Sequence, residues 1–263
     1  MRRSPTPPRP AVAFDRPPSG SWRRGRAEAI ARRRVAPTLV LSLLTLSLAA
    51  PAAAQVGASL SAASDYRFRG VSLSNGRPTL SLDLSRDDPS GLYMGASATV
   101  AGAHAGPQLL ELQEYVGYVR RTRGPWAIDA GLTNSDYARY DERLPSIAYQ
   151  EAYVGLVGRR LAYHLHYSPN YFGQPYGTLY SEVDGTIRTA NDLRLSGHLG
   201  LLAPTGGRRD DKDLQYDWRL AIAAAVRGFD VQLAWTGARP DSESEAGHAR
   251  RRSALVVGVS KAF

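Results

Sequence analysis

The chain has 263 residues, with 33 Lys and Arg against 24 Asp and Glu and no cysteine. A net charge of +9 would ordinarily indicate a nucleic-acid or anionic-lipid partner, but residues 1–54 hold ten arginines and only two acids. The remaining 23 basic and 22 acidic residues leave 55–263 at +1, so nucleic-acid binding loses its main support.

The first 54 residues are typical of an export signal. Arg32, Arg33 and Arg34 precede an apolar stretch over 35–50, and small residues over 52–54 follow it before Gln55. The apolar stretch is shorter than the roughly 20 residues of a spanning helix, so a cleaved signal peptide is favoured over a retained anchor. We predict a basic leader and signal peptide over 1–54 and a single domain over 55–263.

Next, the chain repeats one unit, in which two alternating apolar and polar runs are joined by a tight turn and followed by a longer loop. Leu80, Leu82 and Leu84 alternate with polar residues, for example, before a turn that contains Pro89 and Gly91. This pattern predicts an all-β, antiparallel, up-and-down transmembrane β-barrel of about twelve strands. The expected strands cover 56–65, 80–85, 92–100, 110–119, 126–133, 151–157, 161–167, 179–187, 193–201, 214–222, 229–235 and 255–259.

The connections between these runs alternate in length. Short connections are expected at 86–91, 121–125, 158–160, 188–192 and 227–228, and longer ones at 70–78, 102–108, 134–147, 168–177, 203–213 and 237–252. Short turns on one side and long loops on the other are typical of outer-membrane barrels. A soluble β-sandwich also has regular short strands, but it does not explain the signal peptide and this asymmetry together.

Aromatic residues and one acid add detail to the predicted outward face. Glu114 is the single acidic misfit on the apolar face of its strand. Aromatic side chains near both strand ends would form the interfacial girdles of a membrane barrel. They are Tyr118, Trp126, Phe229 and Phe263 at the turn side, and Tyr66, Phe68, Tyr167, Tyr216, Trp218 and Trp235 at the loop side.

The segment Ser64-Asp65-Tyr66-Arg67-Phe68-Arg69-Gly70-Val71-Ser72 carries a resemblance to a known family. It resembles the N-terminal signature of proteobacterial envelope proteins called the TorF family, to which a porin function is attributed. The strands over 111–119 and 151–157 and the segment over 167–173 are also similar. The resemblance implies an outer-membrane barrel and carries over no catalytic or binding residue.

Charged residues on the predicted inward face are the candidate functional residues. Acids outnumber bases among them, and solvated charges in a lumen bias ion selectivity, here toward cations. Pairing of opposite charges that fills a narrow interior is the open alternative. These candidates are Asp65, Arg67, Asp83, Glu111, Asp129, Glu151, Glu182, Asp184, Arg194, His198, Asp217, Arg219 and Asp230.

The histidines suggest two further chemistries. His164 and His166 lie two apart on one strand face, with Glu182 and Asp184 on the next strand, which is a spacing that a metal site can use. Lumen histidines without metal are far commoner, so we predict no metal and no cofactor. A hydrolase would need a nucleophile near a histidine at the lipid-facing edge. His104, His164, His166, His198 and His248 are instead expected in loops or the lumen.

The sequence therefore predicts a barrel in a Gram-negative outer membrane that passes small polar solutes or ions by passive diffusion and is not an enzyme. A non-conducting barrel with a structural or adhesive role is the alternative. The expected partners are outer-membrane lipid and lipopolysaccharide, the latter through Arg250, Arg251 and Arg252. A homo-oligomer is left open.

Overall fold

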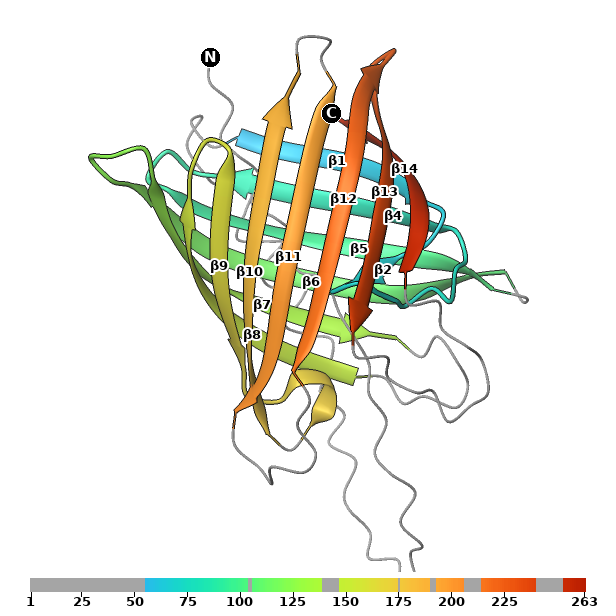
Figure 1. Cartoon of the computed structure of the whole chain (residues 1–263), viewed down its shortest axis with the longest axis horizontal. Coiled ribbons are helices and arrows are strands. Elements are labelled where there is room, and N and C mark those ends of the chain that lie inside the picture. The colour runs from blue at the N-terminus through green and yellow to red at the C-terminus, as the bar shows by residue number, and fades with distance from the viewer. Residues whose placement is uncertain are drawn as a thin grey trace, which may run out of the picture.

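In the computed structural model the chain forms a closed antiparallel β-barrel of twelve strands, which confirms the predicted architecture (Figure 1). The structure describes residues 55–103, 106–138, 147–174, 176–189, 193–205, 214–239 and 253–263, so the predicted signal peptide over 1–54 lies outside the described residues. The barrel strands are β1 (Gln55–Ala63), β4 (Thr79–Asp87), β5 (Leu92–Ala103), β6 (Gly106–Arg121), β7 (Ala127–Tyr137), β8 (Ile147–Val157), β9 (Leu161–Ser168), β10 (Gly177–Arg188), β11 (Arg194–Thr205), β12 (Gln215–Val226), β13 (Phe229–Arg239) and β14 (Ser253–Ala262).

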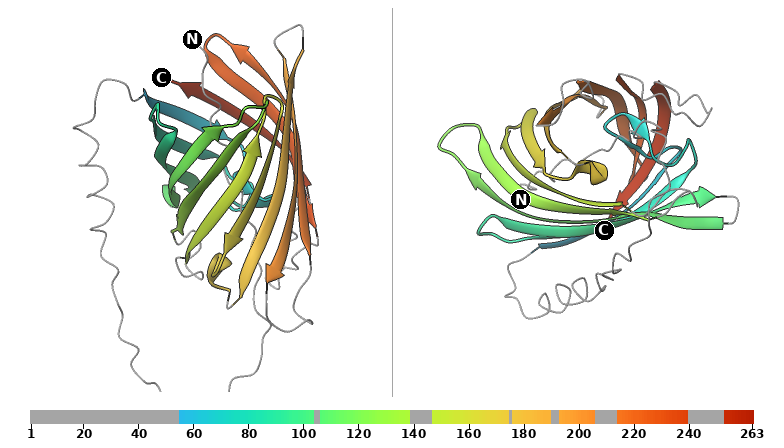
Figure 2. Two further views of the ribbon diagram at one scale, coloured as in Figure 1. Left: turned by 90° about the vertical axis from the view of Figure 1, so that its left-hand side faces the viewer. Right: turned by 90° about the horizontal axis from the view of Figure 1, so that it is seen from below.

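The barrel closes between the first and the last strand. β1 pairs with β4 on one side and with β14 on the other, so that Leu60 lies opposite both Leu82 and Lys261. The backbone nitrogen of Phe263 donates to the carbonyl oxygen of Ala58 beyond the last pair. Closure gives every barrel strand a hydrogen-bonded neighbour on both sides, so the sheet has no edge strand (Figure 2).

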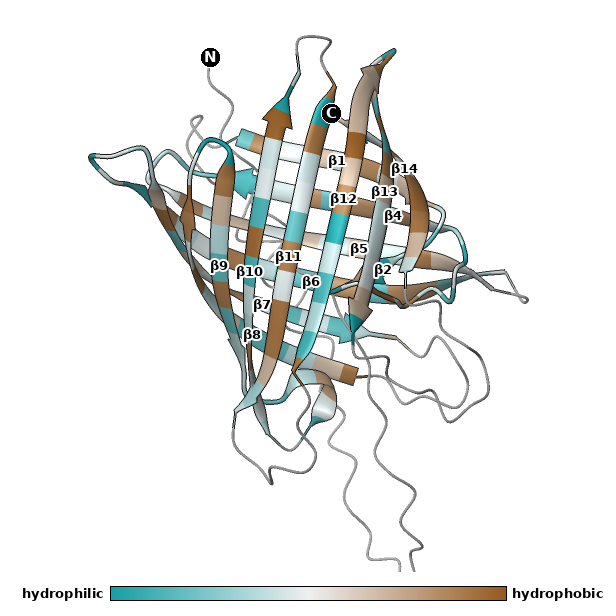
Figure 3. Cartoon of the chain, viewed as in Figure 1, coloured by the Kyte–Doolittle hydropathy of each residue, from teal (hydrophilic) through white to brown (hydrophobic). Residues whose placement is uncertain are grey.

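Period-2 alternation sorts the side chains as the sequence indicates. Leu199, Leu220 and Leu255 point outward and are 66%, 56% and 68% exposed. Serines, threonines and acids on the same strands point inward, which gives the strands their alternating bands in Figure 3. An apolar exterior around a polar interior is the reverse of a soluble sandwich. No helix within the described residues is long and apolar enough to cross a membrane.

Gln55, the first described residue, the C-terminal Phe263 and the short connections lie at one end of the barrel, which we call the turn end. The turns there span 88–91, 122–126, 158–160, 189–193 and 227–228, close to the predicted positions. The longer connections lie at the opposite end, which we call the loop end. The long connection predicted at 102–108 is wrong, because β5 continues to Ala103 and β6 begins at Gly106.

A β-bulge corrects the predicted faces of β6. Glu111 pairs with Thr99 and Leu109 with Val100, which leaves Leu110 as the extra residue. Since a bulge interrupts alternation, Leu110 lies inside the barrel, 2% exposed, rather than on the outward face with Leu112 and Val116, as strict alternation over the predicted strand 110–119 would have it.

The connection over 64–78, which we call the inward loop, folds into the barrel at the loop end. β1 ends at Ala63, and a small hairpin of β2 (Arg67–Phe68) and β3 (Val71–Ser72) follows. Asp65 and Arg67 are therefore on this loop and not on the inward face of the barrel wall. The prediction was wrong here, because it continued the first strand to Asp65 and placed both side chains on that face. Tyr66 and Phe68 are not girdle residues either, since Phe68 is 0% exposed and Tyr66 packs against the buried cluster.

A second inward element completes the filling of the loop end. The 3₁₀ turn η1 (Tyr171–Gly173) follows β9, and seen from below it lies with the β2–β3 segment inside the ring of strands (Figure 2, right). Its rings join an aromatic cluster with wall residues, in which Tyr137 and Tyr149 are stacked with centroids 6.2 Å apart. The cluster consists of Phe68, Leu73, Ala101, Leu110, Tyr137, Tyr149, Tyr171, Phe172, Tyr180 and Leu202.

Candidate functional site

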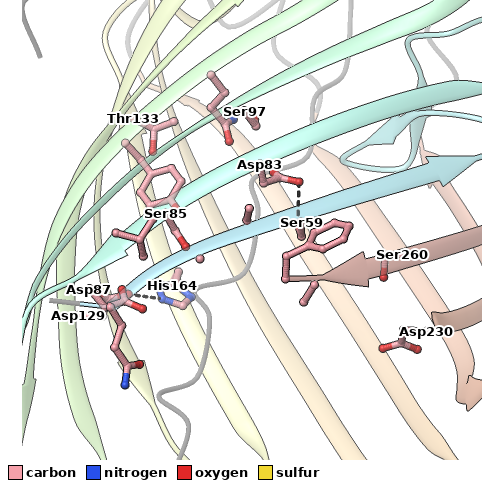
Figure 4. A pocket seen from close by; sticks show the side chains of 18 of the residues that line it. Ser59, Asp83, Ser85, Asp87, Ser97, Asp129, Thr133, His164, Asp230 and Ser260 are labelled. Atoms are coloured by element: carbon pink, nitrogen blue, oxygen red, sulfur yellow. Dashed lines mark hydrogen bonds and ion pairs between the residues drawn. The ribbon is translucent and has the colours of Figure 1, made fainter. Parts of the chain in front are cut away.

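The inside of the barrel is divided into an open part and a filled part. The open part is a cavity of about 740 Å³ that begins at the turn end, where Gln55, Asp87 and Phe263 contribute to its lining. Figure 4 shows the polar side chains that point into it. Among the described residues its lining includes no lysine and no arginine, but it includes five acids and two histidines: Asp83, Asp87, Asp129, Glu182, Asp230, His164 and His166.

The histidines of β9 line this cavity and lie between carboxylates. His164 Nε2 is 3.3 Å from Asp129 Oδ2 (Figure 4), and His166 Nε2 is 3.0 Å from Glu182 Oε1. Tyr93 donates to Asp129 Oδ1 at 2.6 Å. Both of these carboxylates are therefore partnered and nearly buried. Asp83 accepts a hydrogen bond from Ser59 at 3.2 Å and lines the open part.

Glycines make room for the rings of the interior. A Cβ on Gly155 would lie 2.2 Å from the His164 ring, and one on Gly200 would lie 2.0 Å from the Tyr180 hydroxyl. Because Gly155 and Gly200 carry no side chain, the His164 ring and the Tyr180 hydroxyl can approach the backbone at these positions closely. The glycines thus set where His164 and Tyr180 can stand.

A second charged group lies on β10, β11 and β12. His198 stands between two carboxylates, with Nδ1 3.0 Å from Asp184 Oδ1 and Nε2 3.0 Å from Asp217 Oδ1. Tyr180 also donates to Asp217, at 3.0 Å. Glu182, Asp184 and His198 each offer one ligand atom within 4.8 Å of the others, so this group could hold a metal ion.

The filled part is anchored by one arginine of the inward loop. The Nη2 of Arg69 donates to both carboxylate oxygens of Glu151, at 2.9 and 3.0 Å, and both side chains are at most 2% exposed. The guanidinium carbon also lies 3.7 Å from the centre of the Tyr180 ring. Although burial alone would lower it, the Glu151 carboxylate holds the pKa of Arg69 well above its ordinary value.

Carboxylates also shape and fasten the inward loop. Asp65 accepts hydrogen bonds from the hydroxyls of Ser72 and Ser74 and from the backbone of Gly76, and it pairs with Arg67 at 2.7 Å. On the wall, Glu111 accepts from the hydroxyls of Tyr66 and Tyr137. The loop is therefore held by its own polar network and by two glutamates of the wall, Glu111 and Glu151.

The structure places the charged residues singled out in the sequence in three settings. Their role in ion selectivity stays a prediction. Asp83, Asp129, Glu182 and Asp230 line the cavity; Glu111 and Glu151 hold the inward loop, which carries Asp65 and Arg67; Asp184, Asp217 and His198 form the second group, with Arg194 paired to Asp230 and Arg219 bonded to Gln232 nearby.

Arg69 is the functional residue that sequence reasoning missed. Arg69 and Gly70 have positive φ, 41° and 78°, and form a two-residue turn between β2 and β3. The same dipeptide, Arg227 and Gly228, forms the turn between β12 and β13, where the sequence did indicate a minimal turn. An Arg-Gly turn inside the N-terminal signature was therefore the available signal.

Comparisons with known proteins show which family the chain belongs to. The model of a family described as a bacterial protein of unknown function, Gcw_chp, matches residues 48–263, and the chain belongs to that family. No curated protein matches the chain.

Solved structures of small porins are similar in fold. A NanC porin in a rhombohedral crystal form is 10% identical, with 78% of this chain and 98% of that chain covered and a TM-score of 0.51. A KdgM porin is 13% identical, with 79% and 99% covered and a TM-score of 0.48. At this identity the likeness to NanC shows the fold alone, which is a closed barrel like those of bacterial outer-membrane porins.

Proposed function

We propose that this Gcw_chp protein is an outer-membrane barrel, exported by its signal peptide, that passes small cations and small polar solutes by passive diffusion. The observation that carries the proposal is the cavity at the turn end, with five carboxylates and no lysine or arginine among its described lining residues. Asp129 and Glu182 are nearly buried and Asp230 is paired with Arg194, so the attraction for cations and the repulsion of anions are assigned mainly to Asp83 and Asp87.

The membrane location is supported by the outward faces. Large apolar side chains that are more than a third exposed occur on every barrel strand, and in water such a surface would drive association. In a bilayer the same surface meets hydrocarbon, and closure of the barrel satisfies the backbone there. The resemblance of residues 64–72 to the TorF family supports the same location.

The filled loop end favours a second candidate, a non-conducting barrel with a structural or surface-binding role. A buried ion pair between Arg69 and Glu151 and a packed, largely aromatic cluster lie inside the barrel toward the loop end. In a conducting protein, ions must pass beside this filling or the inward loop must move. The two candidates therefore differ in whether the wild-type protein conducts.

Planar-bilayer recording of refolded residues 55–263 tests the proposal. We expect small stepwise currents and, in a KCl gradient, a reversal potential of the sign that cation preference requires. Anion preference would refute the proposed function. Folded, heat-modifiable protein that never conducts, even after removal of the Arg69 side chain, would establish the non-conducting candidate instead.

A further inference from the structure

Three potential metal ligands converge on the interior wall of the barrel. Glu182 and Asp184 project from β10 on the same face, and His198 of β11 is paired with Asp184. One atom from each lies within 4.8 Å of the other two. Ligand atoms around a tetrahedral zinc ion are about 3.4 Å apart, as its bond lengths of about 2.1 Å dictate, so small side-chain rotations suffice.

The hydrogen bonds of His198 point to a metal on its Nδ1. Both nitrogens of His198 face carboxylates at 3.0 Å, an arrangement that an imidazolium satisfies with two protons and a neutral imidazole satisfies with one proton and one bound cation. If Nε2 carries the proton and donates it to Asp217, the Nδ1 lone pair is directed at the Asp184 carboxylate. Two electron-rich groups then face each other, and a cation bound between them would be ligated by both. A carboxylate on the distal nitrogen is the usual support of a metal-bound histidine.

An independent observation comes from β9. His164 is 2% exposed and its Nδ1 has no hydrogen-bond partner, while it lies 3.9 Å from Oε1 of Glu182. A buried ring nitrogen without a partner is costly, and one directed at a carboxylate of the next strand is suited to share a cation with it. Gly155 provides the space in which this ring stands.

Arg69 and Arg219 lie within electrostatic reach of Glu182 and Asp184, respectively, but they donate to Glu151 and Gln232. The nearest guanidinium on the facing strand, Arg219, is paired in register with His198 but donates to Gln232 at 2.7 Å. Glu182, Asp184 and Asp217 therefore face the interior with histidines as their neighbours.

We propose that this group binds a divalent cation of the zinc class. Glu182, Asp184 and the Nδ1 of His198 are the ligands, and His164 supplies the fourth position. Asp217 is a positioning residue, since it acts through His198. The sequence analysis considered His164 with His166 and predicted no metal; in the structure His166 bonds to Glu182, and His198 is the histidine that lies with Glu182 and Asp184. The site needs only the folded barrel and is independent of conduction.

Zinc titration of refolded residues 55–263, stripped with a chelator and followed by calorimetry, tests the site. We expect one equivalent of Zn²⁺ to bind. His198→Gln should weaken binding by at least about 100-fold, and Asp217→Asn by about 10- to 100-fold. Asp88→Asn, in an exposed turn outside the barrel interior, should leave the affinity unchanged.

Because a variant of the interior could fail to fold, each is first checked by heat-modifiable migration, and Co²⁺ absorption serves as a second readout. Four-coordinate Co²⁺ in the wild type, lost in folded His198→Gln, supports the site. Absence of saturable Zn²⁺ binding by the folded wild type, or equal affinity in folded His198→Gln, would overturn the proposal.

Discussion

At the scale of single residues, Arg69 links the inward loop to the wall. Its ion pair with Glu151 is nearly free of solvent, and removing one partner of such a pair leaves an uncompensated buried charge. The contact with the face of the Tyr180 ring adds a cation–π attraction that the same substitution removes. The residue is therefore placed to keep the loop end filled.

Arg69→Ala should destabilise the inward loop by about 3–5 kcal/mol, because Glu151 is then buried without its hydrogen-bonded partner and keeps only His166, 3.9 Å away. We expect larger single-channel currents and a lower urea midpoint. The double variant Arg69→Ala, Glu151→Ala removes both charges, so it should recover part of the midpoint while keeping the larger currents. Arg120→Ala, at an exposed position on β6, is the control and should change neither. Equal midpoints for the single and double variants would contradict the argument.

At the scale of elements, the β2–β3 hairpin meets β13 at a glycine. A Cβ on Gly70 would lie 2.1 Å from the carbonyl oxygen of Gly237, and its φ of 78° is costly for other residues. Gly76 in the same loop has a similar φ of 72° but nothing within 4 Å of its missing Cβ. A comparison of substitutions at Gly70 and Gly76 therefore separates the effect of steric contact from the effect of backbone strain.

Gly70→Ala should push the inward loop away from β13 and make residues 64–78 accessible to protease, whereas Gly76→Ala should cost only the strain of about 1 kcal/mol. Limited proteolysis of the folded variants with mass spectrometry measures this. If both variants are cleaved at the same rate, the contact with Gly237 does not hold the loop.

A polar patch interrupts the outward face of β6, β7 and β8. Glu114 pairs in register with Asn134, which pairs with Gln150. Gln150 donates to Asn134 at 2.8 Å, and Asn134 donates to Asp136 at 2.9 Å. The amides are thus partly satisfied by one another, but the carboxylates lie on a face whose other side chains are mostly apolar.

Glu114→Leu should raise the free energy of unfolding in vesicles by about 1–3 kcal/mol if the patch faces lipid, since a carboxylate is costly there. Val116→Leu, one outward position along β6, is the control and should change it little. A decrease with Glu114→Leu, together with loss of a larger species in native electrophoresis, would show that the patch is instead covered by another copy of the chain.

The elements also show why some of the fold was predictable and some was not. The barrel and its turns follow from period-2 alternation and local turn residues, which are properties of neighbouring residues. The inward loop depends on contacts such as Arg69 with Glu151, 82 residues apart. Alternation over 56–65 fits either a continued strand or a chain that leaves the wall at Ala63, and Leu110 was misplaced because a bulge has no local signature.

At the scale of the whole molecule, charge is distributed along the barrel axis. The turn end holds the acidic cavity, and the loop end holds the buried pair and the aromatic cluster. Inward acids could be predicted from alternation, but which of them face water and which are paired could not. Asp83 and Glu111 are both inward, yet one lines the cavity and the other accepts two tyrosine hydroxyls.

This distribution predicts that the cavity acids set selectivity. Asp83 and Asp87 of β4 both line the cavity that begins at the turn end. Replacing both by Asn removes two of the five lining carboxylates. The reversal potential in a KCl gradient should move toward zero, because the attraction for K⁺ and the repulsion of Cl⁻ both weaken. Ser97→Arg, which adds a positive charge to the same cavity, should move it further in the same direction.

Asp88→Asn is the matched control for this measurement, since Asp88 adjoins Asp87 but belongs to the exposed turn over 88–91. It should leave the reversal potential unchanged at the same ionic strength. The shift for the double variant should also shrink as salt rises, because screening over about 10 Å at 0.1 M already weakens the field of the carboxylates. A reversal potential that is the same in the wild type, the double variant and Ser97→Arg would mean that ions do not pass through this cavity.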